Sequence, residues 1–157
     1  MTISIGQPAP DFELPSSELD NGRPGKKYKL SALRGRPVVL AFYPLDFSPV
    51  CTDQLSLYQE VLGEIESRGA SLVGISVDSS FCHHAFRKHR NLHMPLLADF
   101  NPKGEVSRAY GAWIDSVDHG NRSLVLIDEQ GIVGWSYASP TPAEIPGANL
   151  IFDALSL

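Results

Sequence analysis

The sequence contains only two cysteines, Cys51 and Cys82, among its 157 residues. Two thiols are too few to cross-link a chain of this length, which excludes a disulfide scaffold and favours buried thiols or redox groups in a reducing compartment. The sequence also lacks an apolar run long enough to span a membrane. Its start, MTISIGQPAPDFELP, lacks the basic and apolar segments of a secretory signal. We therefore expect a cytoplasmic protein without a membrane partner.

An excess of positive charge is absent as well. The chain has 13 Lys and Arg against 18 Asp and Glu, a formal net charge of −5. Proteins that bind nucleic acids normally present a basic face, so we expect no nucleic-acid partner. The hydrophobic fraction of 43% is enough for a packed core. The length is that of one domain, and we expect residues 1–157 to form it.

Apolar periodicity predicts alternating strands and helices. The Asn21-Gly22 turn predicts an N-terminal hairpin, with a short edge strand at 27–33. The expected strands that follow are 38–43, 72–77, 94–99, 122–128 and 132–139, and the expected helices are 48–68, 79–92, 102–113 and 148–157. This order predicts an α/β protein with a central mixed sheet, helices on both faces and an N-terminal β-hairpin extension. The pattern is similar to the thioredoxin-like fold.

Cys51 lies near the junction of the expected buried strand and the helix that follows it, in the stretch FYPLDFSPVCTDQLSLY. Reactive groups in parallel sheets gather at the carboxyl ends of strands. Ser48 is a good N-cap and Pro49 a good first helical residue, which makes Cys51 the third residue of the helix. The helix dipole and free N–H groups there favour a thiolate, the nucleophilic form. By position alone, Cys51 is equally well explained as a small buried apolar residue.

Pro44 to Cys51, PLDFSPVC, resembles the signature of the peroxiredoxin family: Pro, three residues, Thr or Ser, two residues, Cys. Four other segments also resemble this family: IGQPAPDFELP, YKLSALRGRPVVLAFYP, PLLADFNPKGEVSRAYGAW and NRSLVLIDEQGIV. The resemblance covers nearly the whole chain and is specific when the segments are taken together. It is greatest to the alkyl hydroperoxide reductase E branch, and next to the bacterioferritin comigratory protein branch.

The resemblance implies a thiol-dependent peroxidase that reduces hydrogen peroxide and organic hydroperoxides without a metal, haem or flavin cofactor. Cys51 matches the peroxidatic cysteine, which becomes a sulfenic acid. Ser48 matches the hydroxyl that holds the peroxide, and Pro44 matches the residue that shields the sulfur. Arg122 matches the arginine that stabilises the thiolate and binds the peroxide oxygens, although a surface arginine at a strand end is the simpler interpretation without the resemblance. The family further implies a homodimer, reduced by thioredoxin or another thiol.

Two residues depart from the family pattern. Ser48 stands where the family more often has Thr, which keeps the hydroxyl but loses the methyl group that fixes its rotamer. Gln54 stands where the family often has Glu. Loss of that negative charge would ease thiolate formation, or it would reflect a different hydrogen-bond network.

Cys82 is the candidate resolving cysteine. It would attack the sulfenic acid of Cys51 and form an intramolecular disulfide, after local unwinding of the first helical turn. The alternative is a free thiol, as in single-cysteine peroxidases that an external thiol resolves. A redox-sensing binding or chaperone module is a further alternative. A disulfide oxidoreductase is disfavoured because SPVC lacks a second cysteine in Cys-x-x-Cys spacing.

We expect no metal site. Cys82, His89 and His93 share one face of the predicted helix, but recognised zinc spacings are absent, so a solvated polar helix is the better interpretation. Asp46 and Asp53 flank Cys51, yet acids in a loop and a first helical turn are ordinary.

Overall fold

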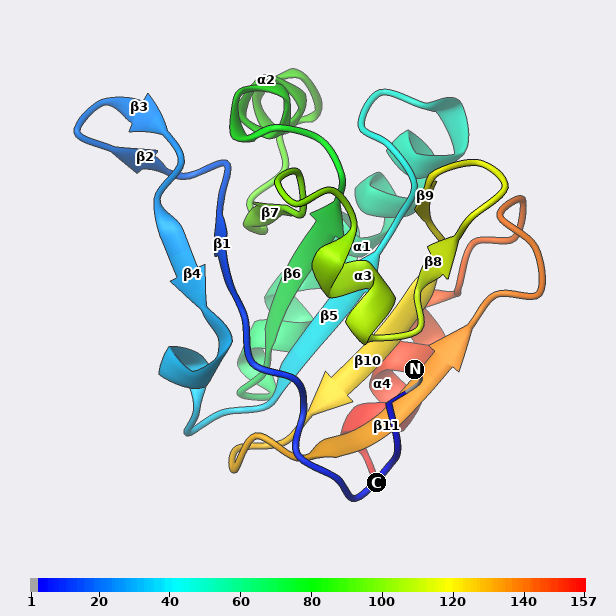
Figure 1. The fold of residues 1–157 in the computed structure, drawn as a ribbon. Helices are drawn as coiled ribbons and strands as arrows, with labels where there is room; N and C mark the ends of the chain where they lie inside the picture. Colours follow the sequence, from blue (N-terminus) through cyan, green and yellow to red (C-terminus); the bar gives the residue numbers. More distant parts are fainter. Residues whose placement is uncertain (1–2) are drawn as a thin grey trace.

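The computed structural model describes residues 3–157 and has a five-stranded mixed sheet at its centre (Figure 1). Across the sheet the strands are β11 (Val133–Ala138), β10 (Ser123–Ile127), β5 (Val38–Phe42), β6 (Ser71–Ser76) and β7 (Leu96–Ala98). The strands β5, β6 and β7 are parallel, whereas β10 runs antiparallel to both β5 and β11. The predicted mixed α/β architecture is confirmed.

Helices cover both faces of the sheet, as the sequence predicts. They are α1 (Pro49–Ser67), α2 (Ser80–Arg90), α3 (Glu105–Ala109) and α4 (Ala148–Leu155). Successive side chains of β5 point to opposite faces. Val39 and Ala41 lie in a core built with α1, α2 and α4, while Leu40 and Phe42 lie in a second core with α3 and the N-terminal segment. Burial on both faces explains why β5 is continuously apolar.

The N-terminal segment forms two small ladders beside the β7 edge of the sheet, at the left in Figure 1. The strands β2 (Leu19–Asp20) and β3 (Arg23–Pro24) make the expected hairpin around Asn21-Gly22, and β1 (Glu13–Pro15) pairs with β4 (Lys27–Lys29). The prediction of a strand over 27–33 is wrong in its second half. The chain turns into a 3₁₀ helix, η1 (Leu30–Leu33), where the Asp11 carboxylate accepts the N–H of Ser31 at 2.9 Å.

The region after β7 differs most from the sequence prediction. The helix expected over 102–113 is shortened to α3, because the Asp99 carboxylate accepts the N–H groups of Val106 and Ser107 and starts the helix there. An unexpected hairpin follows, formed by β8 (Trp113–Ile114) and β9 (His119–Gly120). Two-residue strands carry no alternating pattern that a sequence could reveal. No helix among residues 3–157 is long and apolar enough to cross a membrane.

Candidate active site

Cys51 is the third residue of α1, which confirms the predicted register. Ser48 is the N-cap, with φ −67° and ψ 146°, and Pro49 is the first helical residue. The expected cap by the Ser48 side chain is wrong, however, because its hydroxyl donates to Leu45 O at 3.1 Å. The first intrahelical donor is Thr52 N, 2.9 Å from Ser48 O. The N–H of Cys51 precedes it and so remains available to an anion at the helix start.

Arg122 comes from the start of β10, the strand next to β5, and reaches the sulfur of Cys51. Its Nη1 lies 3.1 Å from Cys51 Sγ and 2.7 Å from Gln54 Oε1. Arg122 directly precedes β10, which pairs with β5 so that Ser123 lies opposite Phe42. Both Cys51 and Arg122 are buried. A guanidinium is permanently charged, so it stabilises a thiolate without exchanging a proton.

Pro44 and Phe47 shape the loop between β5 and α1. Pro44 is buried, two residues after the end of β5. Phe47 has a positive φ of 66°, an uncommon conformation for a bulky residue, and one that costs free energy. Its ring packs against Phe86 of α2, with centroids 5.0 Å apart. The loop that presents Cys51 is therefore held by contacts with α2.

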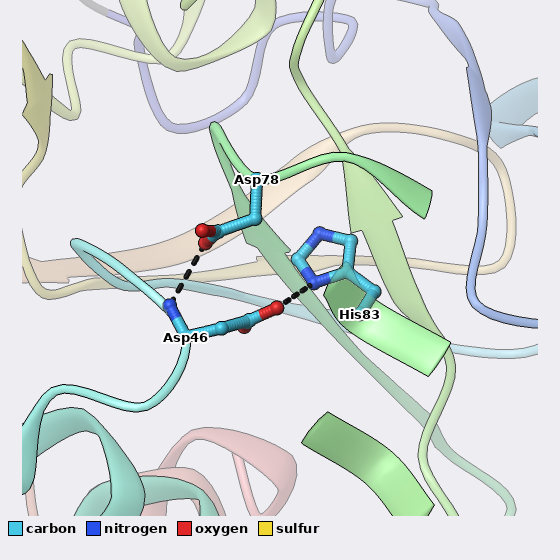
Figure 2. A group of neighbouring side chains, drawn as sticks. All are labelled: Asp46, Asp78 and His83. Carbon is cyan, nitrogen blue, oxygen red and sulfur yellow. Dashed lines mark hydrogen bonds and ion pairs between the residues drawn. The ribbon is translucent and has the colours of Figure 1, made fainter. Parts of the chain in front are cut away.

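Asp46 and His83 form a buried pair that the sequence did not reveal. Figure 2 shows the Asp46 carboxylate directed at the His83 ring, with Asp78 directed at the Asp46 backbone. Asp46 Oδ2 lies 2.7 Å from His83 Nδ1, Tyr43 OH donates to Asp46 Oδ1 at 2.6 Å, and Asp46 N donates to Asp78 Oδ2 at 2.8 Å. His83 Nε2 lies 3.0 Å from Leu97 O. Both ring nitrogens thus face acceptors, so the His83 ring is held in one orientation between Asp46 and Leu97.

This pair corrects two expectations drawn from the sequence. Asp46 is not an ordinary loop acid, since it is only 7% exposed, and α2 is not a uniformly solvated polar helix, since His83 is fully buried. The helix also ends at Arg90, so His93 lies beyond it and does not share a helical face with Cys82.

Metal-type ligand atoms do gather at Asp46, Asp78 and His83, within 4.8 Å of one another. Hydrogen bonds within the protein already engage these atoms, since Ser76 Oγ also donates to Asp78 Oδ2 at 2.5 Å. The cluster therefore holds together as a hydrogen-bonded network. It ties the loop before Cys51 to the start of α2 and the end of β6.

Cys82 lies in the first turn of α2, where its N–H donates to the N-cap Ser79. Its thiol points at Asp78, with Sγ 3.8 Å from Oδ1. Burial, followed by the nearby Asp46 and Asp78 carboxylates, raises the pKa of the Cys82 thiol to about 12. Cys82 is therefore protonated at neutral pH, in a setting opposite to that of Cys51 beside Arg122.

A buried cysteine at a helix start, beside an arginine and at the carboxyl end of a central strand, is typical of proteins that do chemistry with a thiolate. Residues 5–136 match the AhpC/TSA family. The chain therefore belongs to the AhpC/TSA family.

Relatives and solved structures agree with this membership. Peroxiredoxin tpx1 of Schizosaccharomyces pombe is 38% identical, covering 100% of this chain and 81% of that protein. Alkyl hydroperoxide reductase E of Mycobacterium bovis is 30% identical, covering 98% and 97%. The reduced 2-Cys peroxiredoxin of Plasmodium vivax has a TM-score of 0.86 at 28% identity, covering 97% of this chain and 80% of that one. The predicted thioredoxin-like fold and peroxiredoxin family are confirmed.

Proposed function

We propose that the chain is a thiol-dependent peroxidase, which reduces hydrogen peroxide and organic hydroperoxides through Cys51. The thiolate attacks one oxygen of the O–O bond, which breaks. Sulfur keeps that oxygen as a sulfenic acid, and the other oxygen takes a proton and leaves as water or an alcohol. The peroxide is thereby reduced by two electrons, and the sulfur is oxidised by two.

The contact between Cys51 Sγ and Arg122 Nη1 carries this proposal. Negative charge moves from sulfur to the departing oxygen, and a fixed guanidinium stabilises it at both places. Ser48 would hold the peroxide after its hydroxyl turns away from Leu45 O, and Pro44 would keep bulk water from the sulfur. None of these steps needs a cofactor.

Stopped-flow mixing of the reduced protein with hydrogen peroxide tests the function. We expect oxidation at least about 10³-fold faster than that of a free thiol, because donors aimed at developing charge lower the barrier by that order. Mass spectrometry should then find the added oxygen on Cys51. A rate like that of free cysteine would overturn the proposal.

For the second half of the cycle, we propose that Cys82 resolves the sulfenic acid. Its sulfur would attack the Cys51 sulfur and release water, and a thioredoxin-like dithiol would then reduce the disulfide. Both cysteines are free in the structure. The first turn of α1 would have to unwind to bring the two sulfurs together.

The Asp78→Asn variant is expected to form the Cys51–Cys82 disulfide about tenfold faster than the wild type at pH 8. Removing a carboxylate lowers the raised pKa of Cys82, so a larger fraction is thiolate at any pH below it. Non-reducing peptide mapping after one equivalent of peroxide measures the linked peptide over time. If Cys51 is modified while Cys82 stays free in both proteins, an external thiol resolves the intermediate instead.

That external-thiol cycle is the second candidate, and the raised pKa of Cys82 favours it.

We further propose that residues 1–157 act as one domain in a homodimer. Support comes from apolar side chains left exposed near the active-site loop: Leu45 is 40%, Phe47 50% and Phe81 58% exposed. Light scattering measures the molar mass in solution, which for a homodimer is twice that of the chain.

Two free cysteines also fit a reducing compartment such as the cytoplasm.

A further inference from the structure

Gln54 and Tyr58 form a buried polar line between the active site and the loop at residues 139–147, called here the C-terminal loop. Both side chains are fully buried on α1. Gln54 Oε1 lies 2.7 Å from Arg122 Nη1, Gln54 Nε2 lies 3.3 Å from Tyr58 OH, and Tyr58 OH lies 2.7 Å from Pro146 O. The line therefore connects the arginine that touches Cys51 to the end of the C-terminal loop.

The hydrogen bonds of this line run in one direction. A backbone carbonyl accepts only, so Tyr58 must donate to Pro146 O and use its oxygen to accept from Gln54. Burial raises the pKa of Tyr58 above its ordinary value, which keeps the phenol a donor. A guanidinium donates only, so the Gln54 oxygen must face Arg122 and its NH₂ group must face Tyr58. Glutamate at this position would have no such donor for Tyr58.

The C-terminal loop also contacts Arg122 directly. Arg122 Nε donates to Pro142 O, and the N–H of Ser139 donates to Arg122 O at 2.9 Å. Within the loop, the Ser139 hydroxyl donates to Glu144 O at 2.9 Å. Two loop carbonyls, at Pro142 and Pro146, are therefore bound by the Arg122–Gln54–Tyr58 line. The position of the loop and the orientation of the guanidinium depend on each other.

We propose that Gln54 and Tyr58 are positioning residues for the proposed peroxidase reaction: Tyr58 clamps the C-terminal loop to the site, and the uncharged Gln54 orients Arg122 without neutralising it. The Arg122 side chain meets only uncharged oxygens at Gln54 and Pro142 within the described part of the chain, besides the Cys51 sulfur. The positive charge of Arg122 therefore remains available to stabilise the Cys51 thiolate. A glutamate at position 54 would compete with the sulfur for that charge.

A charge at position 54 would act on Arg122 more directly than the other charged groups nearby, because those groups are screened by solvent or paired. The titratable or charged groups on the surrounding elements are Asp53 and Tyr58 of α1, Arg122 before β10, Glu144 in the C-terminal loop, and Tyr43 and Asp46 after β5. Asp53 and Glu144 are exposed, so solvent screens them. Tyr43 and Asp46 bond to each other, and Asp46 is paired with His83.

The Gln54→Glu variant tests the charge, in a Cys82→Ser background in which Cys51 is the remaining thiol. The ultraviolet absorbance of the thiolate against pH should show half-ionisation about one pH unit higher than in the parent protein. The reaction with peroxide at pH 7 should be about tenfold slower. Gln59→Glu is the matched control, since Gln59 lies on the same helix and accepts from His93 N instead. It should change neither quantity.

The Tyr58→Phe variant tests the clamp, because it keeps the ring and removes the hydroxyl. Hydrogen exchange of a peptide covering 139–147 should become about three- to tenfold faster, the factor expected for one lost hydrogen bond. The half-ionisation pH should stay near that of the parent. If Gln54→Glu fails to fold, this measurement still tests whether Tyr58 holds the C-terminal loop against the site.

An unchanged half-ionisation pH in folded Gln54→Glu, or unchanged exchange of the C-terminal loop in Tyr58→Phe, would overturn the proposal. A purely structural role would lower stability without moving the ionisation of Cys51. Thiolate absorbance does not depend on peroxide chemistry. A chain that fails as a peroxidase but still shows the shift would therefore refute the proposed function and not this inference.

Discussion

Replacing Arg122 by methionine is expected to slow the reaction of Cys51 with hydrogen peroxide by about 10²- to 10³-fold, the usual effect of losing one donor aimed at developing charge. Methionine has a similar length and is apolar, so it fills the buried site without introducing a new charge. The thiolate would lose its cationic neighbour at 3.1 Å, and the departing oxygen would lose the same group. Single-turnover stopped-flow kinetics measures the rate constant, with Cys51→Ser as the reference for no reaction.

Two further variants make this result specific. Arg122→Lys keeps the positive charge but not the planar fork, so we expect an intermediate rate constant. Arg68→Met removes an arginine at the far end of α1, where it pairs with Glu64, and should react like the wild type. A rate constant for Arg122→Met within threefold of the wild type would show that the guanidinium does not take part in the chemistry.

Removing His83 is expected to lower the free energy of unfolding by about 3–5 kcal/mol, because the buried Asp46 carboxylate would lose the ring that it pairs with at 2.7 Å. Tyr43 and Asp78 would remain near Asp46, but they do not supply a positive charge. Urea unfolding of reduced His83→Ala measures the loss. Lys88→Ala is the control on the same helix, and because Lys88 is exposed it should change stability by less than about 0.5 kcal/mol.

A double variant distinguishes charge pairing from a simple loss of packing. Asp46→Asn alone should destabilise the protein, since it breaks the pair from the other side. In the His83→Ala background the same change removes an unpaired buried charge, so it should be neutral or stabilising. Equal destabilisation in both backgrounds would mean that Asp46 and His83 do not act as a charged pair.

The strand and helix pattern of the central sheet followed from the sequence because its signals are local. The apolar run at 38–43 predicted β5, and the apolar periodicity over 48–68 predicted α1. Ser48 and Pro49 predicted where α1 begins, because caps depend on neighbouring residues. Where the signal was short or the partner distant, as in β8 and β9, the prediction failed.

Only the tertiary structure decided which polar groups meet. Arg122 lies 71 positions from Cys51, His83 lies 37 from Asp46, and Pro146 lies 88 from Tyr58. No local propensity encodes such pairs, because they depend on how strands pair and helices pack. A resemblance to the peroxiredoxins could name Arg122, but it is the register of β10 against β5 that brings its guanidinium to the sulfur. The sequence by itself determined the helix start that presents Cys51, whereas packing decided that Gln54 would join that site to the C-terminal loop.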